Sequence, residues 1–293
     1  MQFLVFILIY PLIWLLSILP LRVLHFMSDC FYYLLYYVIG YRKKIVIGNL
    51  TLAFPEKSDQ EIVIISKKFY SHFIDIIIEM IKSFTISKKE IARRYKAVNI
   101  DILHQLETRQ KSALFLGAHY ANWEWVFAIN LLVKFNGYAV YKKLKNSFFD
   151  RKIRQSRGRF NTTLVPTKEI FSLIQENHDK HKISLYGFLG DQSPKINKTH
   201  YWSDFLGIKV PIHTGVELLS KKHDLPIVFF KTKRIKRGYY ESTLKLLTDK
   251  PKDFEDYQIT ELFLREVDAQ IREAPEFYLW THKRFKHRDK APD

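Results

Sequence analysis

The sequence predicts an α/β fold in which a mixed, mainly parallel central sheet is flanked by helices. Three observations predict this fold. Short apolar runs alternate with helical patterns from residue 110 onward, a long amphipathic helix pattern precedes them, and residues 1–21 contain no charge. We therefore expect an N-terminal membrane helix over residues 1–21, an interfacial and helical segment over 22–109, and an α/β catalytic domain over 110–293. The single cysteine, Cys30, excludes an intramolecular disulfide.

The first 21 residues have the composition of a membrane anchor. Residues 3–19 are almost wholly apolar, and 17 residues are the lower limit for a helix that crosses a hydrocarbon layer about 30 Å thick. No basic residue precedes this run, and no small-x-small cleavage site follows it, which argues against a cleaved signal peptide. We expect a retained anchor, either single-pass or monotopic. A buried core helix is the alternative.

An aromatic segment and a basic cluster follow the expected anchor. The segment 22–41 is rich in tyrosine, a residue typical of the headgroup level of a membrane, and we expect a second helix in the interface or an ordinary core helix. Arg42, Lys43 and Lys44 come next and are candidates for headgroup binding. By the positive-inside rule they place the rest of the chain at the cytoplasmic face of the inner membrane.

The remaining elements follow from hydrophobic periodicity. Ser58 and Glu61 form a capping-box pattern, so a long amphipathic helix is expected to begin there. Beyond residue 110, buried strands are expected at 113–117, 138–141, 183–189, 227–230, 244–247 and 277–280. Helices are expected between them, at 123–135, 168–176, 214–222 and 258–272.

The charge balance indicates an anionic partner. Lys and Arg number 47 against 30 Asp and Glu, which gives a net charge of +17, and aromatic residues make up 15% of the chain. Nucleic acid, an acidic protein and an anionic membrane all match this balance. The sequence lacks helix-turn-helix, RNA-recognition and zinc-finger signatures, which disfavours nucleic acid as the partner. It also lacks G-x-S-x-G, which disfavours a serine hydrolase, and nothing in it indicates a metal site.

The segment 115–125, FLGAHYANWEW, carries the strongest chemical signal. His119 follows an expected buried strand, and a helix is expected to begin near Asn122. Glu124 then reaches back to His119, fixes the tautomer of the imidazole and supports its role as a general base. Roughly one histidine–acid pair at this spacing is expected by chance from 11 histidines and 30 acidic residues. The alternative is a structural histidine beside a glutamate that favours the helix dipole.

Several blocks occur in the order of a known family. They are NLTLAFPE at 49–56, HYANWE at 119–124, NSFFD at 146–150, RGR at 157–159, GDQSP at 190–194 and LWTHKRFK at 279–286. With these blocks and the apolar N-terminus, the chain resembles the late acyltransferases of lipid A biosynthesis, of the lauroyl and myristoyl type, within the lysophospholipid acyltransferase superfamily. Glutamate rather than aspartate after the histidine is similar to the lipid A branch.

The resemblance implies acyl transfer without a cofactor. The donor would be an acyl group on acyl carrier protein, and the acceptor a hydroxyl of an anionic glycolipid, a lipid A precursor. His119 would remove the proton of that hydroxyl and Glu124 would support it. Arg157 is the candidate for the oxyanion because its charge is permanent, and backbone amides near Asn122 are the alternative. Another acceptor, a lysophospholipid or an aminolipid, is the second hypothesis. A membrane-anchored, basic nucleic-acid-binding protein is the third and least favoured.

Other charged residues have both a functional and a structural interpretation. Arg157, Arg159 and Asp191 are candidates for substrate binding, with a solvated basic face and a plain turn aspartate as the alternatives. Near the C-terminus, headgroups or an acidic carrier protein are candidate partners of Lys283, Arg284 and Lys286, and a disordered basic tail is the alternative. We also expect a basic hairpin end near the membrane surface, formed by Lys231, Lys233, Arg234, Lys236 and Arg237.

Overall fold

A seven-stranded sheet forms the centre of the protein. The computed structural model describes residues 1–291. Within them, the strand order is β1-β9-β8-β2-β5-β3-β4, and every neighbouring pair is parallel except the β8–β9 hairpin. The mixed, mainly parallel sheet is therefore confirmed. The strands of this sheet and of a separate β6–β7 hairpin are β1 (Tyr95–Val98), β2 (Ala113–Gly117), β3 (Asn136–Tyr141), β4 (Thr162–Pro166), β5 (Ser184–Leu189), β6 (Tyr201–Phe205), β7 (Ile208–Ile212), β8 (Ile227–Lys236) and β9 (Tyr239–Thr248).

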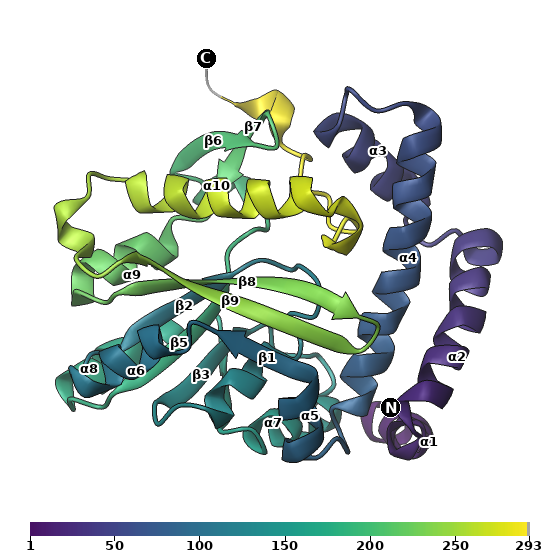
Figure 1. The fold of residues 1–293 in the computed structure, drawn as a ribbon, viewed down its shortest axis with the longest axis horizontal. Coiled ribbons are helices and arrows are strands. Elements are labelled where there is room, and N and C mark those ends of the chain that lie inside the picture. The colour runs from purple at the N-terminus through teal and green to yellow at the C-terminus, as the bar shows by residue number, and fades with distance from the viewer. Residues whose placement is uncertain (292–293) are drawn as a thin grey trace.

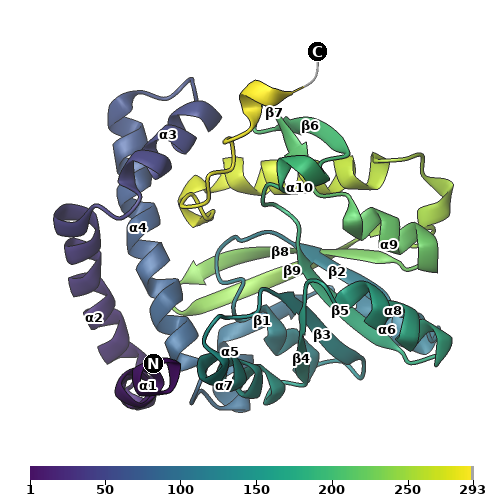
Figure 2. The same ribbon diagram turned by 180° about the vertical axis from the view of Figure 1, so that it is seen from behind.

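Helices cover both sides of the sheet. Figure 1 shows α10 on one side of the strands and α5 and α7 on the other, and Figure 2 shows the same arrangement from behind. The long helix α4 stands beyond the end of the sheet to which the β8 arrow points, which is the carboxyl end of the parallel strands. The α-helices are α1 (Gln2–Ile18), α2 (Leu21–Tyr33), α3 (Lys43–Ala53), α4 (Asp59–Lys82), α5 (Lys88–Arg94), α6 (Asp101–Thr108), α7 (Ser147–Gly158), α8 (Ile170–Asp179), α9 (Gly215–His223) and α10 (Gln258–Glu273).

The start of α4 confirms the predicted capping box. The Ser58 side chain accepts a hydrogen bond from the Glu61 backbone amide, and the Glu61 carboxylate accepts one from the Ser58 amide. These two bonds satisfy amide groups that the first helical turn leaves without partners. They fix the start of the helix that faces the carboxyl ends of the strands.

The N-terminal helix lies against the rest of the protein. In the part of the chain that the structure describes, no helix combines the length and the apolar character needed to cross a bilayer, so the predicted membrane-crossing helix is not supported. The Lys82 ammonium donates to the carbonyl oxygens of Ser17 (2.8 Å) and Leu19 (2.9 Å), which ties the end of α1 to α4. Phe6 packs on Phe148 and Phe149 of α7. Large apolar side chains of α1 remain exposed, namely Phe3, Leu4, Val5, Ile7, Leu8, Ile9, Leu12, Trp14, Leu15 and Ile18.

The aromatic segment after α2 divides between core and surface. Residues Leu34–Ile39 form a π-helix. Tyr36 is buried and packs edge-on against Tyr70 of α4, whereas Tyr37 is exposed. Of the three basic residues that follow, Arg42 donates to the carbonyl oxygen of Thr281 (2.9 Å) and the Lys43 ammonium lies 3.9 Å from the centre of the Tyr36 ring. Lys44 is exposed.

Two predicted elements have a different structure. The expected strand 277–280 begins in a 3-10 turn, Pro275–Phe277, and its only strand pairing with residues 1–291 is an isolated bridge between Tyr120 and Tyr278. Its apolar character reflects burial, since Trp280 is fully buried. The expected helix 123–135 is a shorter 3-10 helix, Val126–Leu131. Strands β1, β4, β6 and β7 were not predicted.

The end of the β8–β9 hairpin is not a free basic surface. The Arg237 guanidinium binds the carboxylates of Asp29 (2.7 Å) and Asp75 (2.6 Å), and Arg234 lies 3.4 Å from Asp75. Lys233 and Lys236 of this hairpin are exposed, so a contact with the membrane surface stays a prediction for them, whereas the two arginines are neutralised by acids of α2 and α4. They fasten the hairpin to the N-terminal helices.

Candidate active site

The loop after β2 carries His119 at the carboxyl end of the sheet. Ala121 adopts a left-handed backbone conformation (φ +47°), which turns the chain sharply after His119. The Ala121 amide donates to the carbonyl oxygen of Phe277 (2.9 Å), and the Leu279 amide donates to that of His119 (3.0 Å). The loop is thus held from both sides of its turn by the C-terminal segment, although these segments lie far apart in the sequence.

The carboxylate that contacts the imidazole is Asp191. His119 Nδ1 lies 2.8 Å from Asp191 Oδ1, and the His119 backbone amide donates to the same oxygen at 3.0 Å. The two residues meet because β2 and β5 are parallel neighbours, with Gly117 opposite Leu189, and each residue stands two positions past its strand. Asp191 is 1% exposed. The next residue, Gln192, places its side-chain nitrogen 3.3 Å from the other ring nitrogen of His119, Nε2.

The environment of Asp191 favours the charged carboxylate. Burial raises the pKa of Asp191, but the nearby His119 and the hydrogen bonds from His119 outweigh burial, so the pKa stays below its ordinary value of 3.8. A carboxylate fixed on Nδ1 keeps the proton on that nitrogen, and leaves Nε2, which the Gln192 side chain faces, as the ring atom that can accept a proton. The sequence placed Asp191 among the substrate-binding candidates, and the structure brings it to the histidine instead.

Glu124 faces a different partner from the one expected. Among residues 1–291 it makes no hydrogen bond to His119, and its carboxylate binds the guanidinium of Arg157 on α7. The segment after the Ala121 turn is not a regular helix, so it does not direct Glu124 back to the ring. Trp123 lies between the two residues in sequence and packs edge-on against the His119 ring, with 5.6 Å between the ring centres.

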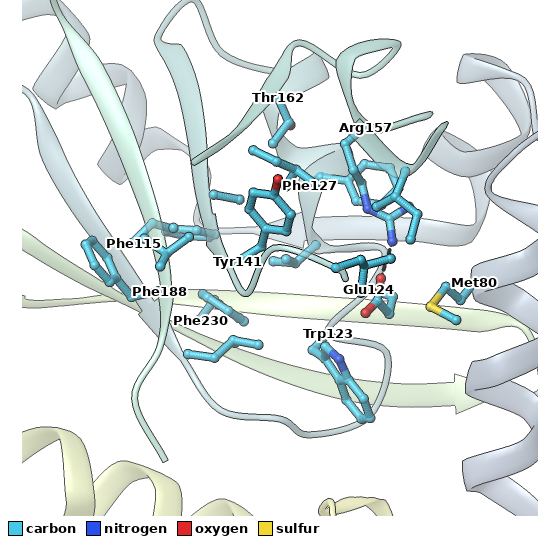
Figure 3. A pocket seen from close by; sticks show the side chains of 18 residues that line it. Met80, Phe115, Trp123, Glu124, Phe127, Tyr141, Arg157, Thr162, Phe188 and Phe230 are labelled. Atoms are coloured by element: carbon cyan, nitrogen blue, oxygen red, sulfur yellow. Dashed lines mark hydrogen bonds and ion pairs between the residues drawn. The ribbon is translucent and has the colours of Figure 1, made fainter. Parts of the chain in front are cut away.

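An apolar cavity of about 310 Å³ adjoins Trp123 and Glu124. Figure 3 shows the Glu124–Arg157 ion pair at one side of this cavity and Phe115, Phe188 and Phe230 at the other. The guanidinium of Arg157 also lies over the Phe127 ring, 4.5 Å from its centre. The arrangement can hold an apolar chain with a polar group near the ion pair. No group of three His, Cys, Asp or Glu residues within the described chain is arranged to hold a metal ion.

Comparison with known proteins assigns the family. The family model for bacterial lipid A biosynthesis acyltransferases matches residues 1–287. The chain belongs to this family. It is also similar to the lipid A biosynthesis lauroyltransferase of Escherichia coli (strain K12), with 25% identity over 249 residues, which cover 84% of this chain and 80% of the relative. The predicted family is thus confirmed, and the protein is an acyltransferase.

Three of the sequence blocks of this acyltransferase contact one another next to the His119 loop. The Asn49 side-chain amide donates to the carbonyl oxygens of Trp280 (2.9 Å) and His282 (2.7 Å). Arg284 is 1% exposed, and its guanidinium donates to the Ser193 hydroxyl at 3.0 Å. The prediction that Arg284 contacts headgroups is therefore wrong, because its side chain is buried. It ties the C-terminal block to the turn that carries Asp191.

A buried glutamate of α4 supports the same loop. Glu79 is fully buried, and its carboxylate accepts hydrogen bonds from the side chains of Asn122 (2.6 Å) and Tyr240 (2.8 Å). The Asn122 side-chain oxygen accepts in turn from the Trp125 amide (2.8 Å). Sequence reasoning missed Glu79. An acid within the apolar face of an amphipathic helix was the available signal, because such a residue requires buried partners.

Of the other basic residues predicted to bind partners, Arg159 makes hydrogen bonds within the protein, and Lys283 and Lys286 are exposed. The Arg159 guanidinium donates to the carbonyl oxygens of Phe84 (2.5 Å) and Ile86 (2.7 Å), just past the end of α4. These bonds satisfy backbone acceptors and fasten the end of α7 to the segment after α4, while Arg159 remains exposed, so its role in substrate binding stays a prediction. Lys283 and Lys286 are exposed, as a contact with an acidic partner requires.

Two histidines near the site predict a pH-dependent stability. Burial, together with Arg234, lowers the pKa of His72 from 6.5 to about 3, and burial with Arg284 lowers that of His282 to about 4. As the pH falls below 6.5, these two histidines become protonated in the unfolded chain before they do in the folded protein. The folded state therefore has its full stability above pH 6.5 and loses stability as the pH falls toward 4 and below. Each proton that is taken up on unfolding lowers the free energy of unfolding by about 1.4 kcal/mol for every unit by which the pH falls.

Urea unfolding between pH 7.5 and pH 4.5 should therefore give a falling free energy of unfolding. A variant with His72→Gln and His282→Gln, which cannot take up these protons, should show a flatter dependence over the same range. Identical slopes for this variant and the natural sequence would contradict the assignment.

Proposed function

We propose that this acyltransferase moves a fatty acyl group from an acyl carrier protein thioester to a hydroxyl of a lipid A precursor. The observation that carries the proposal is His119, held by the buried Asp191 at the carboxyl end of the sheet, with Trp123 between its ring and an apolar cavity. The cavity supplies room for the acyl chain, and His119 supplies a base. The family, and the relative that is a lipid A biosynthesis lauroyltransferase, support lipid A as the acceptor.

The reaction needs one base and one site for developing negative charge. Nε2 of His119 removes the hydroxyl proton, while the proton on Nδ1 is held by Asp191. The hydroxyl oxygen forms the new ester bond to the thioester carbon, the carbon–sulfur bond breaks, and the imidazolium returns its proton to the thiolate. Arg157, or a backbone amide of the loop near Asn122, stabilises the carbonyl oxygen as it becomes negative.

In the proposed reaction, Glu124 acts by positioning Arg157. Its carboxylate holds the guanidinium in the cavity wall, where a thioester carbonyl would arrive with the acyl chain inside. A second role, direct support of the imidazole, requires Glu124 to leave Arg157 when substrate binds. The two roles predict different effects of a substitution at Glu124 on the pH dependence of the reaction.

The surface around the cavity suits an acidic protein and an anionic membrane. Between β3 and α7, Lys142, Lys143 and Lys145 are exposed, and Leu144 among them lines the cavity. We propose that the acidic carrier protein docks at this loop, since opposite charges steer association. The exposed apolar side chains of α1, which packs on α7, would attach the protein to the cytoplasmic face of the inner membrane.

The proposal is tested by reconstitution and mass spectrometry. Purified protein, an acyl carrier protein loaded with a fatty acyl group, and a lipid A precursor in mixed micelles should yield a lipid heavier by that acyl group. Lipid extracts of cells without the gene should lack the same acyl group on lipid A. A mass loss confined to glycerophospholipids or aminolipids, with lipid A unchanged, would overturn the acceptor and leave the acyl transfer in place.

A further inference from the structure

We propose that Gly187 and Ala139 set the upper size of the acyl group that this enzyme transfers. The inference rests on the proposed function, because it takes the cavity beside Trp123 as the site of the acyl chain. It adds a limit on chain length and names the residues that impose it. Both residues lie in the floor of the cavity, on the central strands β5 and β3.

The register of the sheet places one row of residues under the cavity. Phe115 of β2 lies opposite Gly187, Gly187 lies opposite Ala139 of β3, and Ala139 lies opposite Leu164 of β4. Neighbours opposite one another in parallel strands direct their side chains to the same face of the sheet. All four residues line the cavity. The two smallest side chains stand in the middle of the row, between a phenylalanine and a leucine, and this difference in size hollows the face.

The space over Gly187 is open. A Cβ atom added at Gly187 would have the Tyr138 carbonyl oxygen as its nearest neighbour, at 3.4 Å, which is ordinary van der Waals contact. The contrast is Gly117, where an added Cβ would come within 2.2 Å of the Phe230 ring. The glycine at 187 is therefore not required by a close approach of the backbone. A Cβ atom fits there without a clash, and the atoms of a larger side chain beyond it would occupy volume that the cavity now offers.

The cavity volume indicates the class of acyl group. An apolar cavity of about 150 Å³ is known to hold a benzene ring of six carbons. The volume of about 310 Å³ here is roughly twice as large. It therefore corresponds to an acyl chain on the order of ten to fourteen carbons, rather than to a short acyl group.

The orientation of the chain follows from the polar and apolar ends of the cavity. Glu124 and Arg157 lie at one side, and Trp123 connects that side to His119. Phe115 and Gly187 stand four residues before His119 and Asp191, two of them within each strand and two past its end, so the distance along the chain is at most about 13 Å at the rise of a β-strand. A thioester near His119 would thus send its hydrocarbon chain over the row that contains Gly187 and Ala139.

The experiment compares donors of different length on purified full-length variants. With acyl carrier protein loaded with chains of eight to sixteen carbons, Gly187→Val should lower kcat/KM for fourteen-carbon relative to ten-carbon donors about tenfold, since one buried methylene is worth roughly fourfold. Ala139→Val should act in the same direction. Leu164→Ala, which enlarges the cavity, should shift the preference toward longer chains. Gly48→Val, at an exposed helical site with nothing within 4 Å of the added Cβ, is the matched control and should leave the length profile unchanged.

Binding separates this inference from the proposed function. Calorimetric titration of the same variants with free fatty acids of graded length measures binding affinity without any acyl transfer. The chain length that binds most tightly should shift in the same way as the preferred donor. If no donor supports transfer while the length preference in binding shifts as stated, the proposed function fails and the inferred size limit stands. If transfer occurs and the length profile of folded Gly187→Val and Ala139→Val matches that of the natural sequence, the inference is overturned.

Discussion

His119→Ala is expected to abolish acyl transfer, with a fall in kcat of about a thousandfold or more, because the substitution removes the base that takes the acceptor proton. Asp191→Asn should lower kcat by about a hundredfold to ten-thousandfold. The asparagine keeps the shape of Asp191 but lacks the charge that supports the imidazolium, and its amide can bind Nδ1 in the wrong tautomer. Initial rates with loaded acyl carrier protein measure both effects, and circular dichroism checks that the variants fold.

Glu124→Gln is the matched comparison, since it removes the charge of the other carboxylate while preserving its size. The acid limb of the pH–rate profile should shift in Asp191→Asn and keep its position in Glu124→Gln, because the contact with the imidazole belongs to Asp191. The opposite pattern, a shift in Glu124→Gln with an unaltered profile in Asp191→Asn, would show that Glu124 moves to His119 when substrate binds.

The sequence predicted the two strands that lead to His119 and Asp191, and the reason is local. The apolar run 113–117 is β2 residue for residue, and the start of α4 follows from a capping box of four residues. By contrast, the contact between His119 and Asp191 spans 72 residues and exists because β2 and β5 are neighbours. Strand order is not encoded in a local pattern, so sequence spacing favoured the nearer acid, Glu124.

Burial of charged residues was the second property that the sequence did not reveal. Arg157 and Arg284 are buried, whereas Arg151 and Lys283 are exposed, although all four occur in strongly basic segments. A buried guanidinium requires an acid, a ring or a carbonyl oxygen from elsewhere in the fold. For Arg284 these partners come from the turn after Asp191 and from β7, which no local pattern indicates.

Arg157→Ala is expected to lower kcat by about a hundredfold or more, which is the usual effect of losing one donor to a developing oxyanion. Arg151, on the same helix, is exposed and serves as the matched control, so Arg151→Ala should change the rate less than twofold. Arg157→Lys keeps the charge without the planar fork and should recover only part of the activity. Equal, small losses in the two alanine variants would assign Arg157 to the structure of α7 alone.

A double substitution separates the two ways in which Arg157 can act. Removal of Arg157 alone leaves the Glu124 carboxylate unpaired beside an apolar cavity, and that charge by itself can impair binding of the acyl chain. In Arg157→Ala combined with Glu124→Gln the unpaired charge is absent. If Arg157 serves only to neutralise Glu124, the double variant should regain most of the activity lost in Arg157→Ala. If Arg157 stabilises the carbonyl oxygen of the thioester, kcat should stay low in the double variant while KM returns toward its natural value, and this is the result we expect.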